Sequence, residues 1–429
     1  MKGNYMKVLW SVNTILPDVA KAFGLQHGHA ISWVDAMRTA LAQRHPEISL
    51  AIVCNGDTQV KTLVKKQYEG VMYYIMPANG KYKQYWAEIM SEFSPDVIHA
   101  YGTEKKHNIP LIENYARQIP IVISLQGLLS EYHRHYYAFI PKREILLNYT
   151  LRDFLRGGIL AGKRRFIKQS KYERKMLCDV KYVEGRSDWD KAISTNINPA
   201  LTYYHCPRMI RQPFFSYEWQ EEQIEPHSLF VHQGNYPIKG LHFMLDALGI
   251  LSRKYPDMKL YISGGNILNG SKLREGGYTR YIRKKIRDLG LEDRIVFTGY
   301  LNADALAERL SRTHVCVIPS AIENAPNSLA EAMIVGTPCV ASHVGGNAEM
   351  MDYGRLGLLY CYYEPQLLAE RIERLFETPD LARSFSALGR EYTRKKHDPE
   401  HLEHTLLDIY RDMIRTASES GGRGTPESP

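Results

Sequence analysis

The chain has 429 residues, of which 44% are hydrophobic and 24% are charged, and its formal net charge is +8. This composition is ordinary for a folded globular protein and excludes a chain that is disordered throughout. The length exceeds what one hydrophobic core usually spans, so we expect two domains. No run of about 20 apolar residues occurs, and the sequence therefore predicts no membrane-spanning helix.

The N-terminal segment predicts a β-strand and not a signal peptide. Its apolar run, Val8-Leu9-Trp10, is short and is soon interrupted by Ser11 and Asn13, and no small-residue cleavage site follows. The six cysteines show no CxxC and no metal-ligand spacing, and several lie in apolar runs. We therefore expect buried, reduced thiols and a cytoplasmic protein.

The first half of the chain alternates short apolar runs with polar loops and helical patterns, which is typical of a Rossmann-like α/β domain. Loops after the first strand of such a domain often approach a phosphate or an acceptor, which makes Gly28 a candidate. His99 ends a later apolar run, and Gln126 and Gly127 end the next one. The predicted strands cover residues 8–10, 50–54, 71–76, 95–99 and 121–127, and a predicted helix covers about 32–44.

Residues 142–175 form a strongly basic stretch, with eleven Lys or Arg against three Asp or Glu. Apolar residues alternate with the cations, which favours contact with an anionic membrane surface or an acidic, lipid-diphosphate acceptor. A solvated basic helix packed on its domain explains the same pattern. Nucleic acid is not an expected partner, because no recognised nucleic-acid-binding module accompanies the charge.

Residues 180–193 predict a further strand followed by a turn. Arg186 leaves the end of this strand, where it can meet a phosphate or an acidic acceptor or form a surface ion pair. Asp188 and Asp190 form an Asp-x-Asp pair in the same segment. That pair is a metal-binding pattern in some enzymes and also a common tripeptide.

A polar, proline-bounded segment without clear periodicity, Arg211–Pro226, predicts the connection between two domains. The C-terminal part shows helical spacing of apolar residues and then a stretch rich in Gly, Ser, Pro and Glu. We predict a first domain, a linker, a second domain, a C-terminal helix and a disordered tail at residues 1–212, 213–226, 227–398, 399–415 and 416–429, respectively.

The second half also alternates strands with helical patterns. Its first strand ends at Gly234, and the loop after that strand contains Lys239. A later strand ends at Gly299 and is followed by Tyr300. The predicted strands cover residues 229–234, 259–263 and 294–299.

Two glutamates eight positions apart, Glu323 and Glu331, stand in the most informative segment of the chain. Glu323 lies in a loop after a short apolar strand, and Glu331 lies inside an apolar helical pattern. A second short strand and the pair Gly345-Gly346 follow. This order places both loops at the carboxyl ends of strands, where open α/β sheets bind ligands.

The helix that carries Glu331 is predicted to begin at Asn327 and Ser328, which are good cap residues, and to continue through Leu329. A helix start presents free backbone N–H groups and a partial positive charge, which together suit a diphosphate. A carboxylate one turn further in can accept two hydrogen bonds from a vicinal diol such as a ribose. Glu323 can reach the hydroxyls of an attached sugar, so the segment predicts a nucleotide-sugar site.

This segment resembles the retaining glycosyltransferases of family 4, also called group 1 glycosyltransferases. The family pattern is a glutamate, seven residues, a second glutamate, an alanine and a small-residue turn, which Glu323, Glu331, Ala332 and Gly336-Thr337-Pro338 match. The resemblance covers residues 228–415 well and the first half more loosely. It implies the α/β GT-B fold, in which two Rossmann-like domains face each other across a cleft. It implies an acceptor in the first domain, a donor in the second, and no cofactor or metal ion.

The resemblance also implies roles for the candidate residues. Catalytic contacts fall to Glu323, Lys239 and His99. Donor or nucleotide contacts fall to Glu331, Asn327, Ser328, Leu329, Gly234, Gly299 and Tyr300. Acceptor or phosphate contacts fall to Gly28, Gln126, Gly127 and Arg186.

Two departures from the family pattern affect this assignment. Gln126 stands where many members have a histidine, and it cannot act as a general base. The resemblance implies that no such base is needed, because the departing diphosphate oxygen takes the acceptor proton. Asn235 or Tyr236 stands where the family typically has an arginine. The main phosphate anchors are then Lys239 and the helix start, unless another basic residue contributes.

The resemblance predicts a bacterial enzyme, peripheral on the inner face of the cell membrane. It would move a hexose from a UDP- or GDP-sugar to a glycan or a lipid-linked saccharide during synthesis of capsule, exopolysaccharide or lipopolysaccharide. A nucleotide-sugar epimerase or a phosphorylase of the same fold, and a non-catalytic membrane-associated scaffold, are the alternatives. A metal-dependent transferase of the other common fold, using Asp188 and Asp190, is a further alternative.

Overall fold

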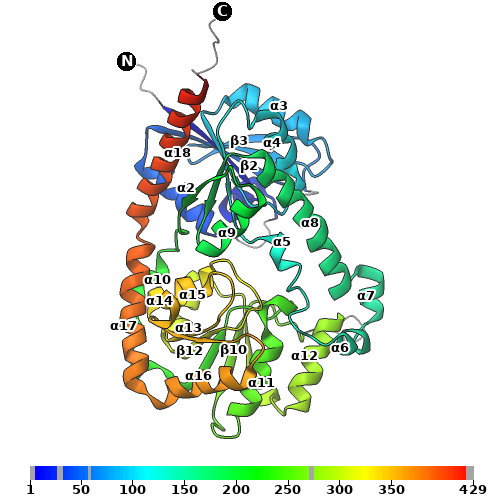
Figure 1. The fold of residues 1–429 in the computed structure, drawn as a ribbon, viewed down its shortest axis with the longest axis vertical. Coiled ribbons are helices and arrows are strands. Elements are labelled where there is room, and N and C mark those ends of the chain that lie inside the picture. The colour runs from blue at the N-terminus through cyan, green and yellow to red at the C-terminus, as the bar shows by residue number, and fades with distance from the viewer. Residues whose placement is uncertain (1–4, 27–31, 57–58, 270–274, 422–429) are drawn as a thin grey trace, which may run out of the picture.

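The computed structural model describes residues 5–26, 32–56, 59–269 and 275–421, which form two α/β domains, one above the other in Figure 1. Within the described residues, the first sheet has eight strands in the order β3-β4-β2-β1-β5-β6-β7-β8, all parallel except β3. The strands are β1 (Met6–Val12), β2 (Ile48–Asn55), β3 (Val64–Tyr68), β4 (Val71–Met76), β5 (Val97–Tyr101), β6 (Ile121–Ser124), β7 (Tyr182–Gly185) and β8 (Thr202–His205).

The second sheet has six parallel strands in the described chain, in the order β11-β10-β9-β12-β13-β14. They are β9 (Glu225–Val231), β10 (Lys259–Ser263), β11 (Ile295–Gly299), β12 (Thr313–Ile318), β13 (Cys339–Ser342) and β14 (Leu358–Tyr360). Its central strands are nearly continuous apolar runs because helices bury them on both faces. The two α/β domains confirm the predicted fold class.

Helices cover both faces of each sheet. The first sheet packs against α1 (Pro17–Phe23), α2 (Ser32–Arg44) and α18 (Pro399–Gly421) on one face and α3 (Tyr82–Phe93), α4 (Ile109–Tyr115) and α8 (Ile159–Asp179) on the other. The second packs against α11 (Leu241–Leu251), α12 (Gly277–Asp288) and α16 (Pro365–Glu377) on one face and α10 (Pro213–Ser216), α13 (Ala303–Ser311) and α14 (Asn327–Val335) on the other. The remaining helices are α5 (Leu129–Tyr132), α6 (Lys142–Leu147), α7 (Leu151–Arg156), α9 (Asp188–Ile197), α15 (Asn347–Met350) and α17 (Pro379–Lys396).

The chain returns to the first domain at its end. Helices α17 and α18 run along one side of the molecule in Figure 1, and Leu406 and Tyr410 of α18 are buried in the core of the first domain. Helix α18 extends to Gly421, past the start of the segment predicted to be disordered. Among the residues the structure describes, no helix is both long and apolar enough to cross a membrane.

The segment predicted as a linker is packed and not loose. Phe214 of α10 is fully buried against the second sheet, and the Trp219 indole N–H donates to the backbone oxygen of Thr313 at 2.8 Å. The aromatic residues therefore fasten this polar stretch to the second domain, and β9 begins at Glu225.

A second connection joins the domains. We call residues 138–158, which lie between α5 and α8, the crossing segment. Its residues Ile140 and Ile145 are buried in the core of the second domain. The Ala138 oxygen lies 2.8 Å from His242 Nε2, and Asp153 accepts the backbone N–H of Gly277 at 2.7 Å. Figure 1 shows α6 beside α12. This part of the first half of the chain is therefore held by the second domain.

Candidate functional site

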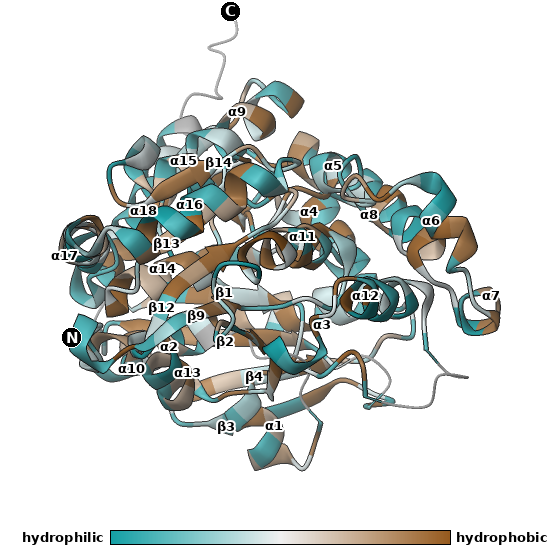
Figure 2. Cartoon of the chain, turned by 90° about the horizontal axis from the view of Figure 1, so that it is seen from below, coloured by the Kyte–Doolittle hydropathy of each residue, from teal (hydrophilic) through white to brown (hydrophobic). Residues whose placement is uncertain are grey.

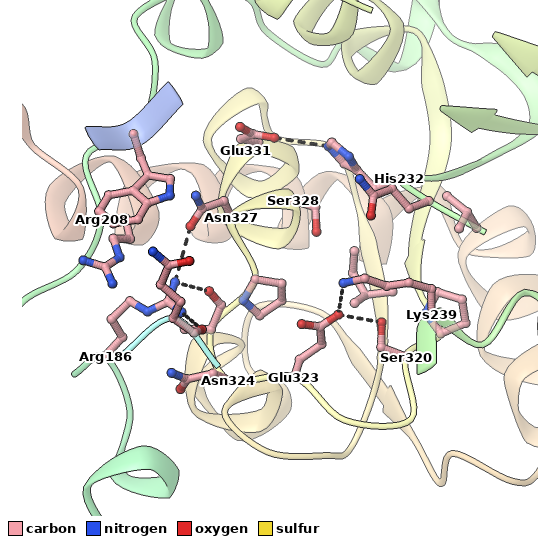
Figure 3. A pocket seen from close by; sticks show the side chains of 18 of the residues that line it. Arg186, Arg208, His232, Lys239, Ser320, Glu323, Asn324, Asn327, Ser328 and Glu331 are labelled. Carbon is pink, nitrogen blue, oxygen red and sulfur yellow. Dashed lines mark hydrogen bonds and ion pairs between the residues drawn. The ribbon is translucent and has the colours of Figure 1, made fainter. Parts of the chain in front are cut away.

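A cavity of about 360 Å³ lies between the domains, lined by loops at the carboxyl ends of their strands. On the second-domain side these loops follow β9 and β12. The two strands are neighbours at the point where the strand order of that sheet reverses. Open α/β sheets bind ligands at such a point, and the topology here brings Lys239 and Glu323 together (Figure 3).

Glu323 and Lys239 form a buried ion pair in this cavity. The Lys239 Nζ lies 2.6 Å from Glu323 Oε1, which also accepts the hydroxyl of Ser320 at 2.8 Å. Burial alone would lower the pKa of Lys239, but the charge of Glu323 and the Tyr236 hydroxyl raise it. The lysine is therefore a cation that holds the Glu323 carboxylate in place.

Glu331 is held from two sides. Its Oε1 accepts a hydrogen bond from Arg211 at 2.9 Å, and its Oε2 lies 3.1 Å from His232 Nε2. Burial favours the neutral acid, but His232 and Arg211 outweigh it and lower the pKa of Glu331. The carboxylate is therefore charged and fixed in orientation, with its side chain only 7% exposed.

The N-terminus of α14 borders the same cavity. Asn327 and Ser328 are the first two residues of the helix, and Pro326 occupies the cap position, with no described side chain capping it. Both Asn327 and Ser328 line the cavity. The first N–H groups of an α-helix have no partner within the helix, so an anion can bind there.

Two glycines allow the loop after β13 to pack against the backbone around Glu323. A Cβ on Gly345 would lie 1.8 Å from the Glu323 carbonyl oxygen, and one on Gly346 would lie 1.9 Å from the Asn324 carbonyl oxygen. The N–H of Gly346 donates to that Glu323 oxygen at 3.1 Å. Only glycine permits this contact, which fixes the loop that carries Glu323.

Two arginines from the first domain form the opposite wall. Arg186 donates to the backbone oxygens of Gln126 and Ala325 at 2.6 and 2.7 Å, and so bridges the domains. Burial and the nearby Arg208 lower the pKa of Arg186 to about 10. Arg208 pairs with Glu184 at 3.1 Å and lies over the ring of Trp33. This wall adds positive charge to the cavity.

The structure brings seven of the fourteen predicted site residues together in this cavity. Those that line the cavity are Glu323, Lys239, Glu331, Asn327, Ser328, Gln126 and Arg186. Gly28 lies outside the described residues. Leu329 is fully buried behind the helix start. The other predicted residues that do not line the cavity are Gly127, Gly234, Gly299 and Tyr300.

His99 does not face the cleft. It is fully buried, its Nδ1 lies 2.7 Å from the hydroxyl of Tyr410, and its Nε2 lies 2.8 Å from Glu184. Burial lowers its pKa. The expected substrate contact is replaced by a structural contact with α18, because the C-terminal helix covers this part of the sheet.

The Asp-x-Asp pair belongs to a helix start. Asp190 forms a capping box with Ser187, and its Oδ1 accepts the hydroxyl of Tyr203. The backbone N–H of Asp188 donates to Glu349 at 2.6 Å. Local helix capping therefore explains this tripeptide. Among the described residues, no group of three His, Cys, Asp or Glu is arranged to hold a metal ion.

Several cavity residues were not predicted from the sequence. Arg208 and Arg211 follow β8, at the edge of the segment predicted as a linker, and His232 follows β9. A basic residue shortly after a parallel strand is the signal that could have identified both arginines, because such positions face the ligand edge of the sheet.

Comparison with known proteins agrees with this geometry. The family model described as glycosyl transferases group 1 matches residues 214–392. Glycosyltransferase YtcC of Bacillus subtilis is 24% identical over 358 residues, which is 82% of this chain and 81% of that protein. D-inositol 3-phosphate glycosyltransferase of Paenarthrobacter aurescens is 31% identical, but the match spans only 41% of this chain and 42% of that protein.

Solved structures show the same fold over nearly the whole chain. Sucrose-phosphate synthase of Thermosynechococcus elongatus has a TM-score of 0.72 at 17% identity, covering 96% of this chain and 100% of that one. Alr3699/HepE of Anabaena, solved with UDP-glucose, has a TM-score of 0.66 at 15% identity, covering 95% and 100%. The fold is therefore GT-B.

Proposed function

We propose that this chain is a group 1 glycosyltransferase, in line with the family match over residues 214–392. It would move a hexose from a UDP- or GDP-sugar to a glycan or lipid-linked saccharide with retained anomeric configuration. The observation that carries the proposal is the juxtaposition of two fixed carboxylates, Glu323 and Glu331, with cations in one cavity between the domains. One carboxylate suits a ribose diol and the other suits the hydroxyls of the transferred sugar.

On the donor side, Glu331 accepts hydrogen bonds from the ribose, while the N-terminus of α14 receives the diphosphate. Lys239 and Arg211 are each paired with one carboxylate but remain 22% and 25% exposed, so they can also contact phosphate. Arg186 is engaged by two backbone oxygens, and Arg208 is paired with Glu184 and only 4% exposed. Arg211 thus takes the place of the arginine expected near Asn235.

On the sugar side, Glu323 binds a hydroxyl of the hexose and is oriented by Lys239 and Ser320. The bond from the anomeric carbon to the diphosphate oxygen breaks, and the acceptor hydroxyl forms the new bond on the same face. The departing diphosphate oxygen takes the acceptor proton, and Lys239 with the helix terminus stabilises the negative charge that develops. The reaction needs no metal ion.

On the acceptor side, the buried amide nitrogen of Gln126 has no hydrogen-bond partner among the described residues. We assign it to an acceptor hydroxyl, with Gly127 beside it. Arg186 acts indirectly, because its bonds to Gln126 and Ala325 hold the two walls in register. The acceptor class places the enzyme at the inner face of a bacterial cell membrane, in the synthesis of capsule, exopolysaccharide or lipopolysaccharide.

A thermal-shift panel of UDP-, GDP- and ADP-sugars tests the donor. A ligand at 100 times its dissociation constant stabilises the fold by about 2.7 kcal/mol, so the right donor raises Tm clearly above the others. NMR of the product formed with that donor then reports the anomeric configuration. An inverted product would overturn the retaining mechanism, and no stabilisation by any nucleotide sugar would overturn the donor assignment.

A further inference from the structure

Exposed apolar side chains gather on one part of the surface. Of the seventeen large hydrophobic side chains that are exposed in the described chain, eight lie between residues 139 and 167. Phe154 is 74% exposed, Leu151 71% and Leu155 70%. Helices α6 and α7 stand at the edge of the molecule in Figure 2, with brown beside teal. We call Leu146, Leu147, Leu151, Phe154 and Leu155 the apolar tip.

Exposed cations surround this tip. Lys142, Arg143, Arg152 and Arg156 are exposed on α6 and α7 themselves. Further exposed cations follow on α8, and we call Arg164, Arg165, Lys168, Lys171 and Arg174 the basic face. Among the described residues, none of the cations of the basic face forms an ion pair with a carboxylate.

The acidic residues of the same stretch are buried or paired. Asp153 accepts the Gly277 N–H, and Glu173 is fully buried and accepts the N–H groups of Leu129 and Ser130. Glu144 is 23% exposed and lies 3.5 Å from Lys284. The exposed charged side chains of residues 142–175 are therefore all basic, which differs from an ordinary solvated helix, where both signs of charge alternate.

The apolar tip is also held in place by packing and helix capping. Ile140 and Ile145 anchor the crossing segment in the core of the second domain, and a capping box between Thr150 and Asp153 starts α7. On α8, Phe166 packs inward against Tyr136, whereas Ile167 is 37% exposed. The side chains left outside are thus held in place by a folded scaffold.

We propose that the apolar tip and the basic face form one membrane-binding surface, with the tip entering the boundary between headgroups and acyl chains of an anionic bilayer while the cations contact lipid phosphates. Apolar side chains beside Lys and Arg are the chemistry of an interfacial helix. This inference rests on the membrane location given above for the enzyme, but on none of its catalytic residues.

A second copy of the chain is the other occupant such a surface could have. In a two-fold contact the same patch occurs on both partners, so each basic face would meet another basic face. Like charges brought together repel. The three acidic residues of the stretch do not compensate, because Asp153 and Glu173 are buried and Glu144 is paired with Lys284. Charge complementarity therefore selects an anionic partner, and the exposed leucines and phenylalanine select a lipid surface.

Vesicle flotation with the full chain tests the proposal. Wild type should float with phosphatidylcholine vesicles that contain phosphatidylglycerol and not with pure phosphatidylcholine, and salt should weaken the binding. Two variants separate the contribution of the apolar tip from that of the basic face. The first carries Leu147→Ser, Leu151→Ser, Phe154→Ser and Leu155→Ser, and the second carries Arg164→Glu, Arg165→Glu, Lys168→Glu and Lys171→Glu.

Each variant should lose binding, the charge variant by roughly a thousandfold if its four residues act independently. The matched controls replace exposed residues elsewhere. One carries Tyr5→Ser, Tyr353→Ser, Leu388→Ser and Tyr392→Ser, and the other carries Lys61→Glu, Arg253→Glu, Arg374→Glu and Lys395→Glu. Both controls should float like wild type. Wild type that ignores anionic vesicles at low salt, or controls that lose binding equally, would overturn the proposal.

A single Phe154→Trp variant reports insertion directly. Its fluorescence should shift to shorter wavelength on adding anionic vesicles and be quenched by brominated lipid, whereas Tyr353→Trp should do neither. A dimer in analytical ultracentrifugation that the serine variant abolishes, without vesicle binding by wild type, would assign the surface to a second copy instead. The serine variant should bind nucleoside diphosphate as tightly as wild type. This measurement tests the proposed donor site independently of membrane binding.

Discussion

The ammonium group of Lys239 lies 2.6 Å from the carboxylate of Glu323, although 84 positions separate them in the chain. They meet because the strands that precede them, β9 and β12, are neighbours at the reversal point of the second sheet. The pair is mostly buried, so removing either partner would leave the other as an unpaired charge, which is costly. A donor phosphate that binds Lys239 therefore also acts on the position of Glu323.

Replacing Glu331 and replacing Glu323 should have different effects on binding and turnover. Glu331→Ala should weaken donor and free nucleoside diphosphate alike, by roughly 1.5–3 kcal/mol for each lost charge-assisted hydrogen bond. Glu323→Ala should chiefly lower turnover and nearly keep the affinity for free nucleotide. Calorimetric titration and initial rates separate these effects, with the exposed Glu308→Ala as control. Wild-type binding and activity in both variants would refute the assignment.

Arg211 should bind the diphosphate of the donor. Arg211→Gln keeps an amide donor for Glu331 but removes the positive charge. We expect the affinity for nucleoside diphosphate to fall by about 1.5–3 kcal/mol, while that for the nucleoside changes much less. Isothermal titration with both ligands measures the difference. Arg390→Gln, a similarly exposed arginine paired with Glu218, should change neither. Equal losses for both ligands would assign Arg211 to the ribose side alone.

Transfer should persist in excess chelator. In the proposed site Lys239, Arg211 and the N-terminus of α14 would meet the diphosphate charge, and Asp190 is used as a helix cap. Initial rates with and without EDTA are the measurement. Activity that EDTA abolishes and Mn²⁺ or Mg²⁺ restores would favour the metal-dependent alternative, and Asp188→Ala would then remove it.

The burial of His242 should make stability fall in acid. Burial lowers the pKa of His242 to about 3, whereas a histidine in the unfolded chain titrates near 6.5. The native state therefore binds fewer protons in this range, so this contribution is complete above about pH 6.5 and is lost as the pH falls towards 3. His242→Gln, which can still donate to Ala138, should flatten the dependence of Tm on pH. His404→Gln, at an exposed position, is the control, and an unchanged slope in His242→Gln would contradict the prediction.

Tyr410 should fasten the C-terminal helix to the first domain. Its hydroxyl accepts the indole N–H of Trp10 at 3.0 Å and lies 2.7 Å from His99. Tyr410→Phe leaves these buried groups unpaired, which costs about 1–3 kcal/mol. Urea unfolding measures the loss, and Tyr353→Phe at an exposed site should cost nothing measurable. A variant as stable as wild type would show that apolar packing alone holds α18.

Local features of the chain were sufficient for the fold class and for part of the site. Strand and helix periods are set by neighbouring residues, and the chain therefore shows alternating α/β units in both halves. Glu323 and Glu331, which line the cavity, could be predicted from their positions after a strand and inside a helix, and Lys239 from the family resemblance. A loop at the carboxyl end of a parallel strand lies at the edge of the sheet where open α/β folds bind ligands.

Only the tertiary structure decided which partners these groups have. His99 lies within β5 and Lys239 in the loop after β9, but α18 covers the first and leaves the second open to the cleft. Arg211 reaches Glu331 across 120 positions, and Asp190 is used by its own helix start. Contacts over such separations depend on strand order and on which helix covers each face. Neither is encoded in local periodicity. The exposure of the apolar tip on α6 and α7 could not be predicted either, because its leucines have the same sequence pattern as those of a buried helix.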